Sequence, residues 1–271
     1  MFMDKQAIFG RIMLIFIALA LVSCKGEFEK IRTSQDPKLV LQKADEYFEE
    51  ENWYRAQVLY ELVINQVRGT AQAENVFYKY AYTHFHLKQY QLAAHYFDNF
   101  SRTFVASPQR EEADFMVAFS NYKESPSYRL DQTPTKNAID RFQVFMNQYP
   151  TSSRVPICNG YIDELRKKLE AKAFHQGELY YNLRQFDAAT RTFENLLKEF
   201  PDSNDEEEVR FLILKSSFLL AQNSIYEKKE ERFLNTIDNF KNFRTKHPKS
   251  KYSKEAENIV ATSKKRLKEF Q

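Results

Sequence analysis

The sequence has few of the residues that build phosphate-binding loops. It contains 5 glycines and 8 prolines in 271 residues, and neither a GxGxxG nor a GxxxxGK[ST] motif occurs. The 40 Lys and Arg residues nearly balance the 37 Asp and Glu residues, whereas a protein that binds nucleic acid mainly through phosphates carries a clear positive excess. These deficits argue against nucleotide chemistry and against a nucleic-acid partner.

Residues that carry catalysis or hold metals are also few and scattered. Only 5 histidines are present, and the closest two are His84 and His86. On a helix, side chains two positions apart point about 200° away from each other, so these two cannot chelate one metal together. No HExxH or GxSxG motif occurs. We therefore expect no enzyme activity, no catalytic residues, no metal site and no cofactor.

What the sequence has in excess is large rings, with 24 Phe and 16 Tyr. Many aromatic residues combined with few glycines favour a helical protein whose packing is built from rings. At 43% hydrophobic and 28% charged residues, the composition is that of a globular protein and not of a disordered one.

The amino terminus has the pattern of a secretory signal peptide. Lys5 and Arg11 precede the apolar run 12–22, which is shorter than the roughly 20 residues that a membrane-spanning helix needs. The run ends in Leu21-Val22-Ser23-Cys24, which resembles the lipobox of bacterial lipoproteins. We predict a signal peptide over residues 1–23 and acylation of Cys24; the alternative is an ordinary signal peptide with a chance cysteine.

The resemblance to a lipobox implies a triacylated mature protein with a tether over residues 24–36. Residues 25–29 read Lys-Gly-Glu-Phe-Glu and lack the aspartate directly after the cysteine that resembles an inner-membrane retention signal. This favours the outer membrane, with the protein on its periplasmic face. The second of the 2 cysteines, Cys158, is then left without an intramolecular disulfide partner, and we expect it to be a small buried residue.

An internal repeat organises the rest of the chain. Five segments place a small residue and then large rings at offsets of three and four, which puts each set on one helical stripe. The segments run over residues 53–67, 90–104, 138–150, 186–201 and 233–248. They resemble the second helices of tetratricopeptide repeats, whose unit is about 34 residues.

The matching first helices are rich in aromatic and alanine residues. We predict them at Pro37–Glu50, Glu74–Leu87, Glu111–Tyr122, Pro156–Leu183 and Asp205–Ser224, with an irregular loop over Glu124–Thr133 and a capping helix at Lys251–Phe270. The expected fold is all-α: a tetratricopeptide-repeat-like superhelical array of about five helix pairs with a C-terminal capping helix. Residues 37–271 would form a single repeat domain.

Three stretches carry a more specific resemblance. They are Trp53-Tyr54-Arg55-Ala56, Tyr149-Pro150-Thr151-Ser152-Ser153, and the segment from Tyr161 through Tyr180-Tyr181 to Phe200-Pro201-Asp202-Ser203. Together with the lipobox and the repeats, they make the chain similar to the BamD family, the repeat lipoproteins of the outer-membrane β-barrel assembly machinery. The resemblance covers most of the mature chain.

The resemblance implies a scaffold that binds other polypeptides. Its amino-terminal repeats would receive the aromatic-ended targeting segments of unfolded outer-membrane proteins, and its carboxy-terminal repeats would hold the POTRA domains of a BamA-like barrel protein, beside other subunits of the complex. The aromatic residues available for a targeting segment are Tyr47, Trp53, Tyr54, Tyr78, Tyr82 and Phe85, each of which could equally be a core ring. The BamA contact would involve Arg191 and Thr192, where the family often has an arginine at the position of Thr192.

Two other functions share part of this pattern. A periplasmic repeat protein that coordinates envelope or peptidoglycan enzymes would have the repeats, but would usually lack Cys24 and the long helix Pro156–Leu183. A nutrient-binding lipoprotein resembling SusD would be much longer than this chain of 271 residues.

Overall fold

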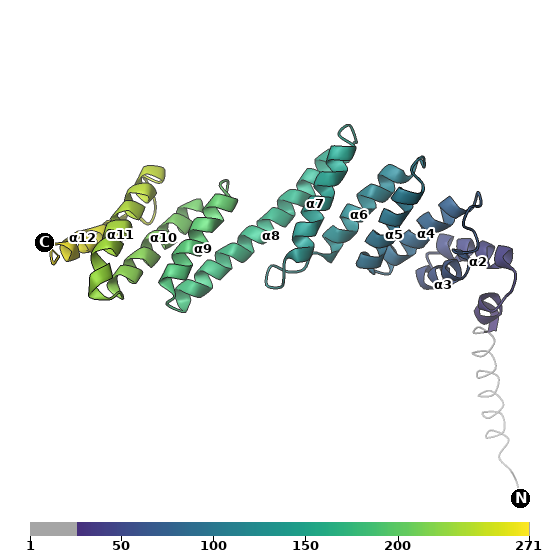
Figure 1. The fold of residues 1–271 in the computed structure, drawn as a ribbon, viewed down its shortest axis with the longest axis horizontal. Helices are drawn as coiled ribbons and strands as arrows, with labels where there is room; N and C mark the ends of the chain where they lie inside the picture. The colour runs from purple at the N-terminus through teal and green to yellow at the C-terminus, as the bar shows by residue number, and fades with distance from the viewer. Residues whose placement is uncertain (1–25, 271) are drawn as a thin grey trace, which may run out of the picture. The chain divides into compact units, whose positions relative to one another are not determined.

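The computed structural model describes residues 26–270, so the predicted signal peptide and Cys24 lie outside the described residues. Residues 26–270 form helices joined by turns and contain no strand (Figure 1). The helices are α2 (Pro37–Glu49), α3 (Trp53–Val63), α4 (Ala73–His86), α5 (Tyr90–Thr103), α6 (Arg110–Glu124), α7 (Thr133–Gln148), α8 (Val155–Asn182), α9 (Phe186–Glu199), α10 (Glu206–Gln222), α11 (Tyr226–Lys246) and α12 (Ser253–Leu267). The prediction of an all-α repeat fold is confirmed.

Most of these bounds agree with the sequence pattern to within a few residues, with two informative exceptions. Helix α3 ends at Val63, although the apolar stripe continues to Val67. Val67 lies in the following turn, where its side chain is buried and its carbonyl accepts a hydrogen bond from the Thr70 amide at 3.0 Å. Helix α11 begins at Tyr226, well before the stripe starts at Phe233. Its first turns are mostly charged and therefore have no apolar periodicity to detect.

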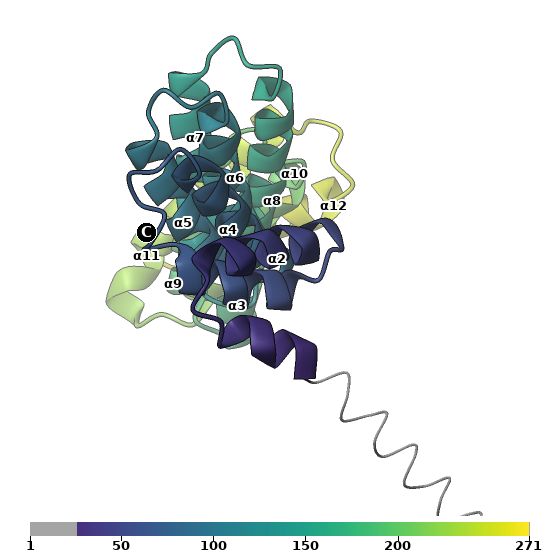
Figure 2. The same cartoon turned by 90° about the vertical axis from the view of Figure 1, so that its right-hand side faces the viewer.

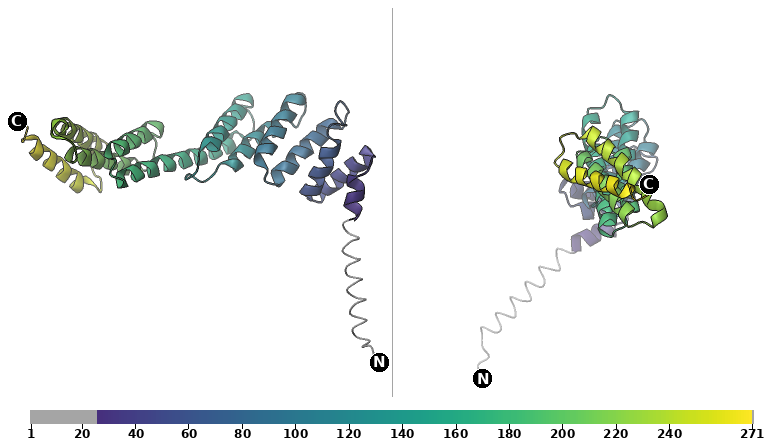
Figure 3. Two further views of the ribbon diagram at one scale, coloured as in Figure 1. Left: turned by 60° about the horizontal axis from the view of Figure 1, so that its bottom comes forward. Right: turned by 90° about the vertical axis from the view of Figure 1, so that its left-hand side faces the viewer.

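The described residues divide into two compact units. Unit 1 comprises residues 26–125 and 133–162, and unit 2 comprises residues 126–132 and 163–270. Within each unit, helices that follow one another in the sequence also pack against one another, as α4 and α5 do in unit 1 and α10 and α11 in unit 2 (Figure 3).

In each repeat, the small residue of the stripe is buried in the repeat core. The five small residues are fully buried: Ala56, Ala93, Ala138, Ala189 and Thr236. The rings that follow them fill the space below, and Tyr60, Phe97, Phe142 and Phe193 are also fully buried. This is the close-packed interior that the stripes predict.

The turns within three repeats share one geometry. Glu51, Lys88 and Arg184 each adopt a left-handed backbone, with φ of 56°, 60° and 59°. Each is followed by a residue whose amide reaches back five positions, as from Asn52 to the Tyr47 carbonyl at 2.8 Å. This is a Schellman turn, which satisfies the last carbonyls of the preceding helix. The sequence gives no glycine to mark these turns.

The start of the described chain is packed and not extended. Residues 26–32 are helical, Ile31 is buried in the first core of unit 1, and Phe28 packs against the same core. Figure 2 shows this short helix beside α2 and α3. The predicted tether over residues 24–36 therefore includes a segment that contacts the repeat.

Candidate functional site

An open aromatic groove lies in unit 1 where the turn between α2 and α3 meets α4. Its volume is about 350 Å³, and its lining consists of Phe48, Trp53, Asn75, Tyr78, Lys79, Tyr82, His86 and Gln109. Five of these residues come from α4 at offsets that place them on one helical face. The same helix faces the repeat core with Val76, Tyr80 and Ala81, so the groove is the outer side of a helix whose inner side is fixed by packing.

Trp53 and His86 form one wall of the groove. Their rings are stacked, with centroids 3.9 Å apart and an interplanar angle of 8°, and Phe48 meets Trp53 edge-on at 5.2 Å. Partial burial lowers the pKa of His86, which favours the neutral imidazole at neutral pH. The wall therefore presents flat, uncharged rings to whatever enters the groove.

Tyr78 and Tyr82 are neighbours in the groove lining, and their hydroxyls lie close together. The Tyr82 hydroxyl donates a hydrogen bond to Glu112 Oε1 at 2.9 Å. The Tyr78 hydroxyl oxygen lies 3.4 Å from the Tyr82 hydroxyl oxygen. Burial raises the pKa of both phenols, so both remain protonated hydrogen-bond donors. Glu112 is in turn paired with Arg154, which anchors this polar end of the groove.

Lys79 is the charged residue of the groove lining. Its Nζ lies 2.9 Å from Asp45 Oδ1 and 3.2 Å from Glu49 Oε1, and 5.1 Å from the centroid of the Phe48 ring. Burial alone lowers the pKa of Lys79, but its hydrogen bonds to the two carboxylates and their charges outweigh that effect and raise it. The ammonium therefore stays charged and is held in place by α2.

The groove joins apolar ring faces to fixed polar tips. Such a surface suits an extended polypeptide with an aromatic side chain, since ring faces stack and hydroxyl or ammonium groups bond to backbone carbonyls. Among the described residues, no group of three or more His, Cys, Asp or Glu side chains is placed to hold a metal ion.

The six aromatic residues singled out from the sequence separate into two sets. Trp53, Tyr78 and Tyr82 line the groove. The other three are not in its lining. Tyr47 packs against Phe28 and beneath Arg55, and Tyr54 is 64% exposed to solvent. Phe85 stacks on Phe119 in the next core. The structure thus brings three of the six together and leaves three elsewhere.

Sequence reasoning missed Phe48, Lys79 and His86 as groove residues. His86 follows Tyr78 and Tyr82 at the same spacing of four on α4, so its place on their face could have been predicted. Lys79 lies on the same face of α4, three positions before Tyr82, and could have been found in the same way. Phe48 could not, because its place beside Trp53 and Lys79 depends on how α2 packs.

The remaining candidate positions are ordinary in their surroundings. Arg191 is 75% exposed and its Nε lies 3.1 Å from Asp187 Oδ2 on the same helix, and Thr192 is half-buried. Cys158 is fully buried, and burial raises the pKa of its thiol to about 11. His84 is buried too, and its Nδ1 lies 2.6 Å from Gln89 Oε1.

The comparison with protein families gives one result. A family model described as YfiO, outer membrane lipoprotein, matches residues 33–209 and 178–270. A search of curated proteins gives no match. Within residues 26–270, no helix combines the length and the apolar character needed to cross a membrane.

Proposed function

Because the chain belongs to the YfiO family of outer membrane lipoproteins, we propose that it is a BamD-like scaffold of the outer-membrane β-barrel assembly machinery. The observation that carries the proposal is the family match, which runs from residue 33 to residue 270 and so includes both units. In this proposal the protein acts by binding other polypeptides and catalyses no reaction. A lipid on Cys24 holds it on the periplasmic face of the outer membrane.

We place the targeting segment of an unfolded outer-membrane protein in the aromatic groove. The groove supports this because Trp53, His86 and Tyr82 offer ring faces, while the Lys79 ammonium offers a hydrogen-bond donor. An aromatic side chain at the end of such a segment would stack on the Trp53 wall. Residues on α2, α4 and α6 fix these side chains by ion pairs and packing, so binding requires little rearrangement.

We assign the contact with the POTRA domains of a BamA-like protein to unit 2. This rests on the family resemblance. Arg191 is well exposed, and its side chain pairs with Asp187, four residues earlier on the same helix. Thr192 is half-buried beside it, so Arg191 is the residue better placed to reach a partner.

Binding in the aromatic groove can be followed by tryptophan fluorescence, since the sequence contains 1 tryptophan, Trp53, and it lines the groove. We expect a synthetic peptide ending in phenylalanine to shift or quench the Trp53 fluorescence of the mature lipoprotein in detergent, and the same peptide with its aromatic residues replaced by alanine to leave it unchanged. His86→Ala should weaken binding by about tenfold because it removes one stacked ring.

Tyr54→Ala is the matched control for this measurement. Tyr54 is exposed on the same helix as Trp53 and lies outside the groove, so its removal should leave the affinity unchanged. Equal losses in the His86 and Tyr54 variants, or no loss in either, would show that the peptide binds elsewhere.

A further inference from the structure

A second groove in unit 1 lies between α5 and α7, over α6. Its volume is about 220 Å³, and it is lined by Asp98, Ser101, Arg102, Arg110, Asp114, Val117, Arg141, Val144, Phe145 and Gln148. Asp114 follows Glu112 by two positions on α6, so the two side chains point about 200° apart. Because Glu112 bonds to Tyr82 of the aromatic groove, this second groove is on the other face of α6 and is a separate site.

Two arginines are held near one another by a shared carboxylate. Asp98 Oδ2 lies 2.9 Å from Arg102 Nη2, and Asp98 Oδ1 lies 3.8 Å from Arg141 Nη1. The first arginine belongs to α5 and the second to α7. Asp98 thus positions two guanidinium groups from different helices at the edge of the groove, where 73% of the Arg102 side chain and 46% of the Arg141 side chain remain exposed.

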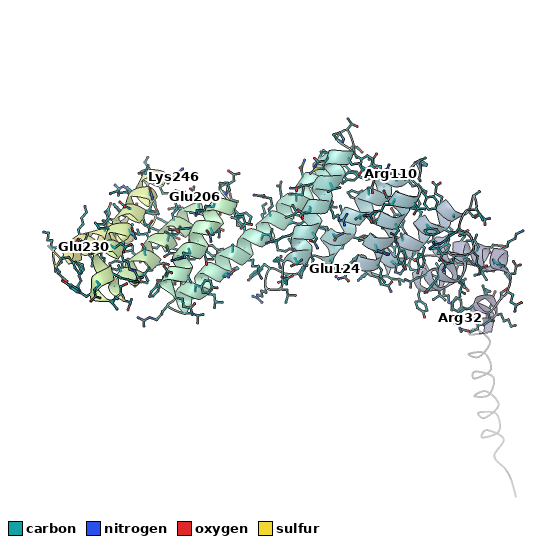
Figure 4. The ribbon with its side chains drawn as sticks, viewed as in Figure 1. Arg32, Arg110, Glu124, Glu206, Glu230 and Lys246 are labelled. Carbon is teal, nitrogen blue, oxygen red and sulfur yellow. The ribbon has the colours of Figure 1, made fainter. Side chains whose placement is uncertain are left out.

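A third arginine and a second carboxylate lie further along the groove. Arg110 begins α6, next to the turn that joins α5 to α6 (Figure 4). Its Nε lies 3.9 Å from Asp114 Oδ2 and 3.5 Å from Ser101 Oγ. Asp114 is better held by its other partners, the Tyr149 hydroxyl at 2.7 Å and the Gln148 amide at 3.2 Å.

The charges in this groove do not cancel. Three guanidinium groups face two carboxylates, which leaves an excess of one positive charge. An arginine has five N–H donors, and the contacts of Arg141 and Arg110 with the aspartates are long. The guanidinium groups can therefore take up one more carboxylate through short, charge-assisted hydrogen bonds.

The floor of the groove is apolar. Val117 and Phe145 are buried beneath the arginines, and Val144 is 55% exposed beside Arg141 on the same face of α7. A ligand that places a carboxylate between the arginines can therefore rest an adjoining apolar side chain on Val144.

Unit 2 contains the equivalent groove with different chemistry. Helices α9, α10 and α11 correspond to α5, α6 and α7 in the repeat, and their groove is lined by Glu194, Leu197, Lys198, Arg210, Ile213, Asn239, Asn242 and Phe243. The shared stripe aligns Asn239 with Arg141 and Asn242 with Val144. The two cations of this groove, Lys198 and Arg210, are matched by Glu194 of the lining and by Glu206, which pairs with Arg210 at 2.8 Å. Once this pairing is counted, the groove has no excess positive charge, and it has no exposed valine.

We infer that the groove between α5 and α7 binds an acidic peptide, by taking one carboxylate of a partner polypeptide between Arg102 and Arg141 and an adjoining apolar side chain on Val144. The excess of a single positive charge matches a monoanion. A phosphate dianion is disfavoured, because Asp98 and Asp114 repel its second charge. The site is independent of the aromatic groove and of the assembly role proposed above.

The test uses the full mature lipoprotein in detergent and blocked, fluorescently labelled decapeptides of glycine and serine with Leu-Glu-Val at the centre. We expect this peptide to bind about tenfold more tightly than its Leu-Gln-Val counterpart, since a charge-assisted hydrogen bond is lost in the latter. R102Q and R141Q should each remove the preference for glutamate. Lys198→Gln, at the position in unit 2 that corresponds to Arg102, should leave it unchanged.

Two further arms identify the source of the carboxylate. A peptide that ends in valine with a free carboxyl group tests a chain terminus, and inorganic phosphate tests a dianion as competitor. Tighter binding of either acidic peptide than of its uncharged form supports the site. Which of the two acidic peptides is preferred shows whether the bound carboxylate belongs to a side chain or to a chain terminus. Three results would overturn the proposed site. The first is equal affinities for the Glu and Gln peptides together with no preference for the free terminus, and the second is a preference for the acid that survives both arginine variants. The third is displacement of the peptide by phosphate at a concentration at which sodium chloride has no effect.

Discussion

Replacing Gly177 by alanine is expected to destabilise the protein, although alanine is the better helix former. Gly177 lies inside α8, where helix propensity alone favours alanine by about 1 kcal/mol. A Cβ at this position would lie 2.5 Å from Phe193 Cε1 and 2.7 Å from two further atoms of the same ring. The Phe193 ring is fully buried and packs against Phe174 at 6.0 Å, so it has no space into which to move.

Overpacking of this kind costs about 1–3 kcal/mol and sometimes more, which exceeds the gain in helix propensity. We expect a net loss of about 2 kcal/mol in the free energy of unfolding, measured by urea denaturation of the mature chain followed by circular dichroism.

Gly160→Ala provides the matched control, because Gly160 lies in the same helix and nothing is within 4 Å of its added Cβ. That variant should be more stable than the wild type by about 0.5–1 kcal/mol. A Gly177→Ala protein as stable as the Gly160→Ala protein would contradict the close approach of α8 to α9.

Replacing Cys24 by serine is expected to move almost all of the protein from the membrane fraction to the soluble periplasmic fraction. Each buried methylene group of an acyl chain contributes about 0.8 kcal/mol to membrane binding, and more than one chain is needed for stable anchoring. Serine cannot form the thioether on which this acylation depends. Fractionation of cell envelopes followed by immunoblotting measures the change, and intact mass spectrometry of the wild type should show the mass of the added lipid.

Cys158→Ala is the control for this experiment, since it removes the other of the 2 cysteines. Cys158 is buried in the fold, so its replacement should leave the protein in the membrane fraction. Recovery of the Cys24 variant in membranes, at the level of the Cys158 variant, would rule out Cys24 as the anchor.

The repeat pattern predicted the helices well because their packing is local. Each stripe sets a small residue such as Ala189 and a ring such as Phe193 on one face, and this periodicity follows from the sequence alone. The Schellman turns at Glu51, Lys88 and Arg184 could not be predicted, because no glycine marks the left-handed position and the backbone there is fixed by the helices on either side.

The aromatic groove was only half predictable for a related reason. Spacing along α4 places Tyr78 and Tyr82 on one face, and His86 continues that face. Lys79 also lies on this face, but its contact with Phe48 depends on its ion pairs with Asp45 and Glu49, which join α2 to α4 across 34 and 30 positions of the chain. The charge excess between α5 and α7 is likewise a property of three packed helices and has no signal in the sequence of any one of them.

The central proposal, a scaffold for barrel assembly, is tested most directly by affinity capture of the wild-type lipoprotein from detergent-solubilised envelopes, with the captured proteins identified by mass spectrometry. We expect an outer-membrane barrel protein with POTRA domains to be recovered in amounts comparable to the lipoprotein itself. Reproducible recovery of peptidoglycan enzymes or of a glycan-uptake complex, without any POTRA-containing protein, would contradict the proposed role.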